Sequence, residues 1–400
     1  MKICYIVYRE DNVMVFESQV LQYLKALKKQ PEIEEIELVV FRHEENIRKK
    51  DAVEVKIKQF VSSTKTFASL PVLSKTQLDV NAFRLKSYIK KRYAKEDKIS
   101  IICRGELATY MGAKAFANHT NSRILFDNRG LPIEESEMRY QDKRVHVINR
   151  KIKRVALEYA KSHCDMYNFV TNAMREYVLK TYNYSAQIPF TIIPTLFHPE
   201  PVDAAGWNKV VHVEEYDLSQ MVISYIGSTA SWQSTSELVD IIMKIATRYD
   251  NSRFIILTKG IIPELDNLPQ KIRGRVTIKG VPHNQIKYYL KMSDFGIVIR
   301  DDNIVNQVAA PTKIAEYLTA GVGMLYAGNI GILKDIDSVA IAERIIAIDK
   351  DENWLDKLEA FQATGDKAVD LSVISYFSME ARQRDTIDMI MTSFKTPKVR

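Results

Sequence analysis

Strand-like and helix-like segments alternate along this chain, and the alternation constrains its fold more than any other feature. The first run opens with the apolar strand KICYIVY, followed by the helix VMVFESQVLQYLKALKK with Phe16, Val20, Leu24 and Leu27 on one stripe. Further strands are expected at EEIELVVF, VEVKI, ISIICRG, SRILFDNRG, MYNFVT and FTIIPT. Alternating β and α segments predict a parallel sheet covered by helices.

The alternation stops and then starts again. Residues 201–220 have mixed charge and no clear period, which is typical of a linker. After them the strands MVISYIG, RFIILTKG, RVTIKG, FGIVIR and VGMLYA follow, with helical segments among them. We therefore expect an α/β chain with two Rossmann-like, doubly wound domains at 1–200 and 221–375, and a final helix at 376–400 packing back toward the first. Ligands bind beyond the carboxyl ends of such strands, so two facing sheets would form a central cleft.

Composition is that of a globular protein, because 46% of the 400 residues are hydrophobic and 27% are charged. The start MKICYIVYRED lacks the long apolar region of a signal peptide, and no run of 18 apolar residues suggests a membrane span. The three cysteines, Cys4, Cys103 and Cys164, are scattered and are expected to be buried, reduced thiols. No Cys/His spacing indicates zinc. These features favour a cytoplasmic protein without a metal centre.

The positive charge lies in the first half of the chain. Residues 1–200 hold 34 Lys and Arg against 24 Asp and Glu, whereas the remainder holds 23 against 26. This balance favours an anionic partner such as a membrane surface, a lipid diphosphate or nucleic acid, and the alternative is a merely solvated basic face. Because no basic–aromatic strand platform is visible, nucleic acid is not expected.

Several loops that follow strands of the second domain could bind a ligand. Gly227 and Ser228 would let backbone approach a diphosphate, or they form an ordinary turn. Arg300, directly after an apolar strand, has the planar fork that suits phosphate oxygens, or it pairs with a neighbouring aspartate. Val281 and Pro282 would pack beside a base, or their loop caps the next helix.

The stretch AAPTKIAEYLTAG, residues 309–321, reads as a helix with unusual features at its start. Pro311 suits the first turn, but the preceding Ala309 and Ala310 are not capping residues, which leaves the first N–H groups available for an anion. Lys313 and Glu316, three residues apart, are expected on a common exposed face. They would bind a phosphate and a ribose diol, or form a surface ion pair worth about 0.3 kcal/mol.

Together these motifs resemble the donor half of GT-B fold glycosyltransferases, most closely the retaining family four. The resemblance is carried by YIGS, ILTKG, KGVPHNQIKYYLKMSDFGIVIR and N-x-x-x-x-PTKIAEYLTAG, and more loosely by RILFDNRGLPIEE and IIPT in the first half. It implies that Glu316 binds the ribose of a nucleotide-sugar, and that Lys313 and the backbone near Thr312 hold the diphosphate. The other donor-side residues it implies are Gly227, Ser228, Lys259, Val281, Pro282, Arg300 and Pro311.

The chain departs from the family pattern at three places, one of which is that YREDNVMV has no glycine where the family commonly has a glycine-rich loop. The acid expected eight residues before Glu316 is Val308, so its sugar-contacting role is unfilled or falls to Asn306 or a nearby aspartate. The family's acceptor-side His after an Asp is not evident, and DNRG offers Asp127 and Arg129 as catalytic candidates instead.

The resemblance implies transfer of a sugar from a UDP or GDP type donor to a glycan or lipid-linked acceptor, with retention, without a metal or other cofactor, in bacterial surface polysaccharide synthesis. A peripheral position at the inner face of a membrane is expected from the basic clusters Lys90–Lys91–Arg92 and Arg150–Lys151–Lys153–Arg154. The alternatives are a non-catalytic partner that keeps the fold and a sugar-nucleotide epimerase on the same scaffold.

Overall fold

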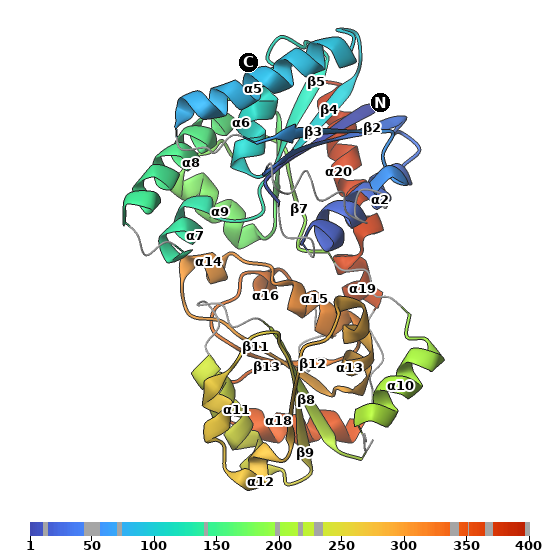
Figure 1. The fold of residues 1–400 in the computed structure, drawn as a ribbon, viewed down its shortest axis with the longest axis vertical. Coiled ribbons are helices and arrows are strands. Elements are labelled where there is room, and N and C mark those ends of the chain that lie inside the picture. The colour runs from blue at the N-terminus through green and yellow to red at the C-terminus, as the bar shows by residue number, and fades with distance from the viewer. Residues whose placement is uncertain are drawn as a thin grey trace. The chain divides into compact units, whose positions relative to one another are not determined.

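The chain forms two compact units, which we describe separately. Unit 1 comprises Met1–Pro194 and Met379–Arg400, and unit 2 comprises Thr195–Ser378 (Figure 1). The computed structural model describes all residues except 11–14, 44–56, 70–73, 140–142, 197–200, 215–218, 228–234, 337–343, 351, 365–370 and 397–400.

Unit 1 is built on a seven-stranded parallel sheet with the order β3-β2-β1-β4-β5-β6-β7. Its strands are nearly continuous apolar runs because both faces of the sheet are covered. In chain order they are β1 (Lys2–Tyr8), β2 (Glu35–Arg42), β3 (Ser63–Ala68), β4 (Ile99–Arg104), β5 (Ser122–Asp127), β6 (Met166–Phe169) and β7 (Phe190–Ile192).

Helices cover both faces of this sheet. On one face lie α5 (Lys75–Arg92), α6 (Glu106–Ala115) and α8 (Lys143–His163), and on the other lie α2 (Gln22–Lys28) and α20 (Met379–Ser393) (Figure 1). The π-helix η1 (Phe16–Leu21) leads into α2, and their Phe16, Val20, Leu24 and Leu27 are all buried, as the stripe predicts. Unit 1 also contains α7 (Pro132–Arg139) and α9 (Asn172–Thr181).

The third strand differs from the one expected at VEVKI. Residues 53–56 lie outside the described part of the chain, and Ile57 lies in a short helical turn. The strand that pairs with β2 is β3, whose pattern is weak because only Phe67 is buried at this edge of the sheet.

Unit 2 is built on a six-stranded parallel sheet with the order β10-β9-β8-β11-β12-β13. Its strands are β8 (Met221–Ile226), β9 (Ser252–Leu257), β10 (Val276–Lys279), β11 (Phe295–Ile299), β12 (Gly323–Ala327) and β13 (Ile345–Ala347), the last of which the sequence pattern did not indicate. Its helical segments are α10 (Ala204–Glu214), α11 (Thr235–Arg248), η2 (Pro263–Asn267), α12 (Gln270–Arg273), η3 (His283–Gln285), α13 (Ile286–Met292), α14 (Ile304–Gln307), α15 (Thr312–Thr319), α16 (Ile332–Asp335), α18 (Trp354–Thr364) and α19 (Leu371–Phe377).

The segment expected to be a linker at 201–220 holds helix α10, which packs on α13 within unit 2. The hydroxyl of Tyr288 donates to Asp203, and the Nζ of Lys287 donates to the carbonyl of Pro201 at 2.9 Å. A Cβ at Gly206 would collide with the ring of Tyr288, so glycine permits this close contact.

The carboxyl-terminal segment forms two helices instead of the single one expected. Helix α19 belongs to unit 2, whereas α20 belongs to unit 1 and packs on α2. Ion pairs at 2.7 Å join Lys29 to Glu380 and Arg384 to Glu32, and Arg123 donates to the carbonyl of Ser393 at 2.9 Å.

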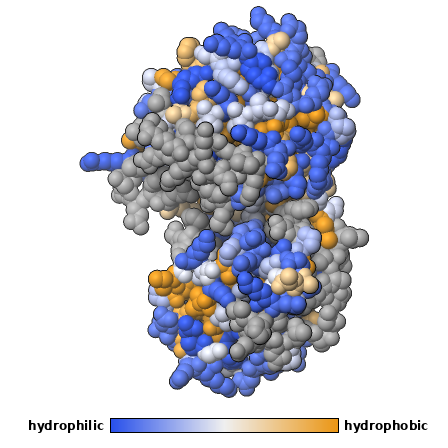
Figure 2. Space-filling view, turned by 45° about the vertical axis from the view of Figure 1, so that its right-hand side comes forward, coloured by the Kyte–Doolittle hydropathy of each residue, from blue (hydrophilic) through white to orange (hydrophobic). Residues whose placement is uncertain are grey.

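The three cysteines are free and buried, as expected. Hydrophilic residues predominate on the face shown in Figure 2, and hydrophobic ones form smaller groups.

Candidate functional site

The donor-side candidates gather at the carboxyl edge of the sheet in unit 2. Gly227, Lys259 and Arg300 follow β8, β9 and β11, which are neighbours in the sheet order. The N–H of Gly227 donates to the carbonyl of Leu257 at 3.2 Å, so it is not available to a ligand. Ser228 lies outside the described residues.

Arg300 supplies an uncompensated cation at this edge. Among the residues that the structure describes, its guanidinium has no ion pair or hydrogen bond, although Asp301 and Asp302 follow it directly. Burial lowers the pKa of Arg300, because desolvation outweighs the attraction of Tyr225 and Asp301. A half-buried guanidinium without a hydrogen-bonded partner can bind an anion such as phosphate.

The glycine after β12 helps to place Arg300. The N–H of Arg300 donates to the carbonyl of Ala327 at 3.2 Å. Gly328 has a φ of 91°, and a Cβ there would collide with the carbonyl oxygen of Arg300. Only glycine fits this close backbone crossing.

Glu316 is buried, which corrects the expectation of an exposed Lys313–Glu316 face. Its side chain is 1% exposed, and its Oε2 accepts a hydrogen bond from Lys313 Nζ at 2.9 Å. Burial alone would raise the pKa of Glu316, but Lys313 and His283 hold that pKa below its ordinary value. The carboxylate is therefore ionised within a compact ion pair, not on a solvated face.

The second oxygen of Glu316 lacks a good donor. Oε1 is buried without a hydrogen bond among the described residues, and Nε2 of His283 lies 3.5 Å from it. His283 is 41% exposed and so lies on the solvent side of the carboxylate. Sequence reasoning missed His283, although it follows Val281 and Pro282 directly in the loop already considered.

The start of α15 is uncapped, as the sequence predicts. Pro311 occupies the cap position, one residue earlier than the expected first turn, and no side chain bonds the first N–H groups. The N–H of Ile314 donates to the carbonyl of Pro311 at 3.1 Å, which leaves those of Thr312 and Lys313 at the helix terminus. An anion is favoured at such a terminus.

Tyr317 fixes α15 to the sheet. Its hydroxyl accepts a hydrogen bond from the N–H of Ile226 at 3.0 Å, one residue before Gly227. A Cβ at Gly296 would fall inside the Tyr317 ring, so a glycine in β11 is what allows the ring to lie there. Tyr317 thus ties the helix that carries Lys313 and Glu316 to the end of β8.

Asn306 and Val308 stabilise the loop between β11 and α15. Asn306 is 3% exposed, and its amide donates to the carbonyl of Asp301 at 3.0 Å. Val308, at the position where the family has an acid, is 2% exposed and belongs to the core. Asp302 accepts a hydrogen bond from Gln307 at 2.8 Å.

The remaining donor-side candidates are more accessible. Pro282 and Lys259 are exposed, Val281 is half-buried, and no ion pair of Lys259 is found in the described part of the chain.

The unit 1 candidates belong to a charged cluster at the carboxyl edge of its own sheet. Asp127, at the end of β5, is 1% exposed and lies 3.8 Å from Arg104 and 3.5 Å from Arg129. Arg129 also donates to the carbonyls of Ile193 and Pro194 at 3.0 and 3.3 Å. Asp127 therefore lies buried beside two guanidinium groups, and its Oδ1 accepts no hydrogen bond from the described residues.

Arg104 was not selected from the sequence, although it ends an apolar strand just as Arg300 follows one. It lies 3.9 Å from Glu10 and donates to the side chain of Gln19. Burial alone would lower the pKa of Arg104, but Tyr5, Asp127 and Glu10 raise it.

The described residues contain no group of three or more His, Cys, Asp or Glu side chains placed to hold a metal ion. They also contain no helix long and apolar enough to cross a membrane.

Solved structures of glycosyltransferases share this fold. A glycosyltransferase from Rickettsia africae ESF-5 is similar with a TM-score of 0.68 and 14% identity, over 99% of both chains. The galactosyltransferase WaaB of the lipopolysaccharide outer core, in its apo form, has a TM-score of 0.66 and 11% identity, over 98% of this chain and 99% of that one. Anabaena Alr3699/HepE in complex with UDP has a TM-score of 0.61 and 11% identity, over 99% of this chain and 98% of that one.

These likenesses show the fold. The chain consists of two Rossmann-like domains with parallel sheets, as in the GT-B glycosyltransferases. No protein-family model and no curated protein matches the sequence. Membership of family four stays a prediction.

Proposed function

We propose that this protein is a glycosyltransferase that uses a nucleoside diphosphate sugar as its donor. The observation that carries the proposal is the unpaired guanidinium of Arg300 at the same sheet edge as the buried carboxylate of Glu316. These groups have the chemistry to bind a diphosphate and a ribose diol. The Anabaena protein of the same fold has been solved with UDP and with UDP-glucose, which favours a uridine nucleotide.

The transfer breaks the bond between the anomeric carbon and the β-phosphate oxygen. The acceptor oxygen bonds to the anomeric carbon and releases its proton to solvent, and the nucleoside diphosphate leaves with the electron pair and negative charge of the broken bond. Arg300, Lys313 and Lys259, with the uncapped start of α15, would stabilise that charge. We propose on this basis that transfer needs no resident metal ion, and activity should withstand a chelator.

We propose retention of configuration, a glycan or lipid-linked acceptor and a role in bacterial surface polysaccharide synthesis. The resemblance to family four supports these points, and the similar galactosyltransferase acts on the lipopolysaccharide outer core. In unit 1 the cluster of Asp127, Arg129 and Arg104 is the proposed acceptor side, with Asp127 buried beside both arginines.

A panel of UDP and GDP sugars, incubated with candidate lipid-linked and glycan acceptors, tests the proposal through release of nucleoside diphosphate. Release that depends on an acceptor and is lost in Arg300→Ala supports transfer. Interconversion of the sugar nucleotide without an acceptor would identify an epimerase instead. Nucleotide binding without turnover of any donor–acceptor pair would favour a non-catalytic partner protein that keeps the fold.

A further inference from the structure

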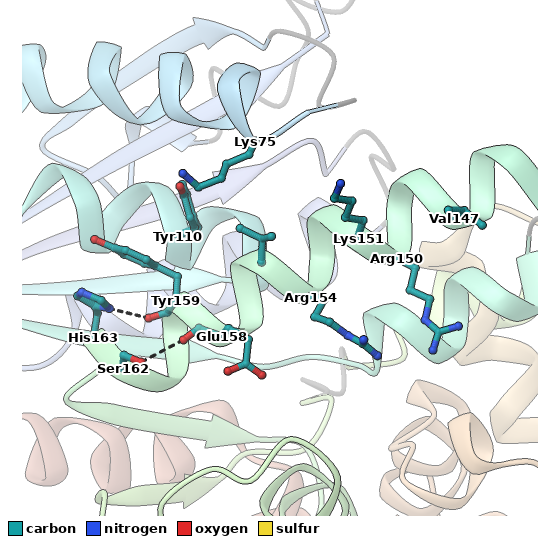
Figure 3. A pocket seen from close by; sticks show the side chains of 11 residues that line it. Lys75, Tyr110, Val147, Arg150, Lys151, Arg154, Glu158, Tyr159, Ser162 and His163 are labelled. Carbon is teal, nitrogen blue, oxygen red and sulfur yellow. Dashed lines mark hydrogen bonds between the residues drawn. The ribbon is translucent and has the colours of Figure 1, made fainter.

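A hollow of about 680 Å³ lies in unit 1 against helices α5, α6 and α8. Most of its lining comes from α8, and Tyr110 of α6 and Lys75 of α5 lie beside Tyr159 (Figure 3). The rings of Tyr110 and Tyr159 are 4.7 Å apart, centroid to centroid. The hollow contains none of the candidates for nucleotide-sugar binding.

The hollow is strongly positive. Lys75, Arg150, Lys151 and Arg154 line it, against one carboxylate, that of Glu158. Arg150 is 3.7 Å from Glu137, and Lys75 is 3.4 Å from Asp79. No hydrogen bond or ion pair holds Lys151 or Arg154 within the described ranges. Two exposed cations on adjacent turns of one helix are therefore available to an anionic partner.

Large apolar side chains are exposed on the same helices. On α8, Val147 is 60% exposed and Ile148 is 40% exposed, and Val147 also lines the hollow. On α5, Phe83 is 69% exposed and Val80 is 40% exposed. Because α6 packs against both α5 and α8, these residues belong to one layer of helices on unit 1 (Figure 1).

We propose that the exposed side of α8 at Val147, Lys151 and Arg154 binds an anionic membrane surface, together with the exposed apolar residues of the same helix layer, and that the hollow receives a lipid phosphate. Cations next to exposed aliphatic and aromatic side chains suit a bilayer interface, where charges meet headgroups and apolar groups enter the acyl boundary. A nucleic acid would use the cations but would leave the exposed aliphatic side chains of Val80, Val147 and Ile148 in water.

The structure shows which cations of the basic sequence clusters are already bound within the protein. Arg92 pairs with Glu35 and lies 3.5 Å from Glu37, and Lys153 donates to the carbonyl of Pro132 at 2.8 Å. These two cations are therefore engaged within the protein. Lys151 and Arg154 carry the proposal, which does not depend on the donor chemistry of unit 2.

Flotation of the full chain with vesicles tests this proposal. Phosphatidylcholine vesicles are compared with vesicles that also contain phosphatidylglycerol, at about 0.01 M and about 1 M salt. The variant Lys151→Glu/Arg154→Glu is matched with Lys244→Glu/Lys350→Glu, which changes the net charge equally at exposed lysines of unit 2. Thermal unfolding checks that both variants remain folded.

We expect binding only to the anionic vesicles at low salt. The α8 variant should lose at least about 25-fold in affinity, since each basic residue contributes about fivefold near an anionic surface, and the matched variant should bind as the wild type does. The substitution Val147→Asn should weaken binding to the anionic vesicles as well. Equal losses in both charge variants would overturn the proposal, because net charge alone would then explain binding.

Two further arms separate the other possible ligands. Calorimetric titration of inorganic phosphate into the protein without vesicles should show no binding, and binding that is lost in the α8 variant would mean that the hollow takes free phosphate instead. Binding to single-stranded RNA that exceeds binding to vesicles and is lost in the α8 variant would likewise contradict a membrane partner.

Discussion

Nε2 of His283 lies 3.5 Å from Oε1 of Glu316, and the imidazole is 41% exposed whereas the carboxylate is 1% exposed. The other oxygen of Glu316 is held by Lys313 at 2.9 Å. Oε1 is therefore the oxygen of Glu316 that a ligand hydroxyl would reach in the proposed ribose site, and His283 is the exposed side chain beside it.

Replacing His283 by alanine should weaken UDP binding about fivefold, because it removes the side chain beside the free oxygen of Glu316 in the proposed ribose site. The melting temperature should change little, since His283 is exposed. Calorimetric titration of UDP measures the effect, and His163→Ala, at an exposed histidine of unit 1, is the control. Unchanged affinity in His283→Ala would show that the contact has no role in binding.

Replacing Arg300 by alanine should reduce UDP affinity by about 10- to 100-fold, the scale of a lost charge-assisted pair, and should affect UMP less. Arg300→Lys should recover only part of the loss, because lysine lacks the planar fork. Stability should stay the same or rise, since burial disfavours the charge of this group. A large drop in melting temperature with unchanged UDP affinity would assign Arg300 a structural role.

The sequence predicted the fold class well because strand and helix periods are local properties. It predicted that Arg300 and α15 would share a sheet edge, because the carboxyl ends of parallel strands lie together. It placed Glu316 on an exposed face, since spacing of three residues shows only that Lys313 and Glu316 are neighbours. The burial of Glu316 is a tertiary property, and His283, which lies 3.5 Å from its carboxylate, comes from elsewhere in the chain.

Other features depended on tertiary contacts that no local pattern contains. The helix at 204–214 is stabilised by packing on Tyr288 and reads as a linker in isolation. Strand β3 has few buried residues because it lies at an edge. Asp127 ends β5 and is paired with Arg104 at the end of the neighbouring strand β4, a contact that no local pattern contains. Arg104 could still have been selected from the sequence by the strand-end rule that selected Arg300.

The ion pair of Glu316 should make stability depend on pH. Its pKa in the folded protein lies below the ordinary value of 4.5, so the stabilisation is present above that value and is lost as pH falls through the folded pKa. The difference in unfolding free energy between wild type and Glu316→Gln should therefore shrink from about pH 6 to about pH 3. Urea unfolding of both proteins measures it, and a difference that does not vary with pH would contradict the assignment.

The substitution Gly296→Ala should destabilise unit 2 by about 1–3 kcal/mol, because the Tyr317 ring occupies the space that the added methyl group would need. Tyr317→Phe should cost about 1 kcal/mol, since it removes the acceptor of the Ile226 N–H but keeps the ring. Urea unfolding followed by tryptophan fluorescence measures both. Gly274→Ala, where the added Cβ has only ordinary contacts, is the control, and equal effects at the two glycines would contradict the packing argument.

A crystal structure of the protein with UDP would locate the nucleotide. We expect a diphosphate in contact with Arg300 and the start of α15, and ribose hydroxyls donating to Glu316 beside His283. A nucleotide bound away from the carboxyl edge of the unit 2 sheet, or one that contacts neither Arg300 nor Glu316, would contradict this expectation.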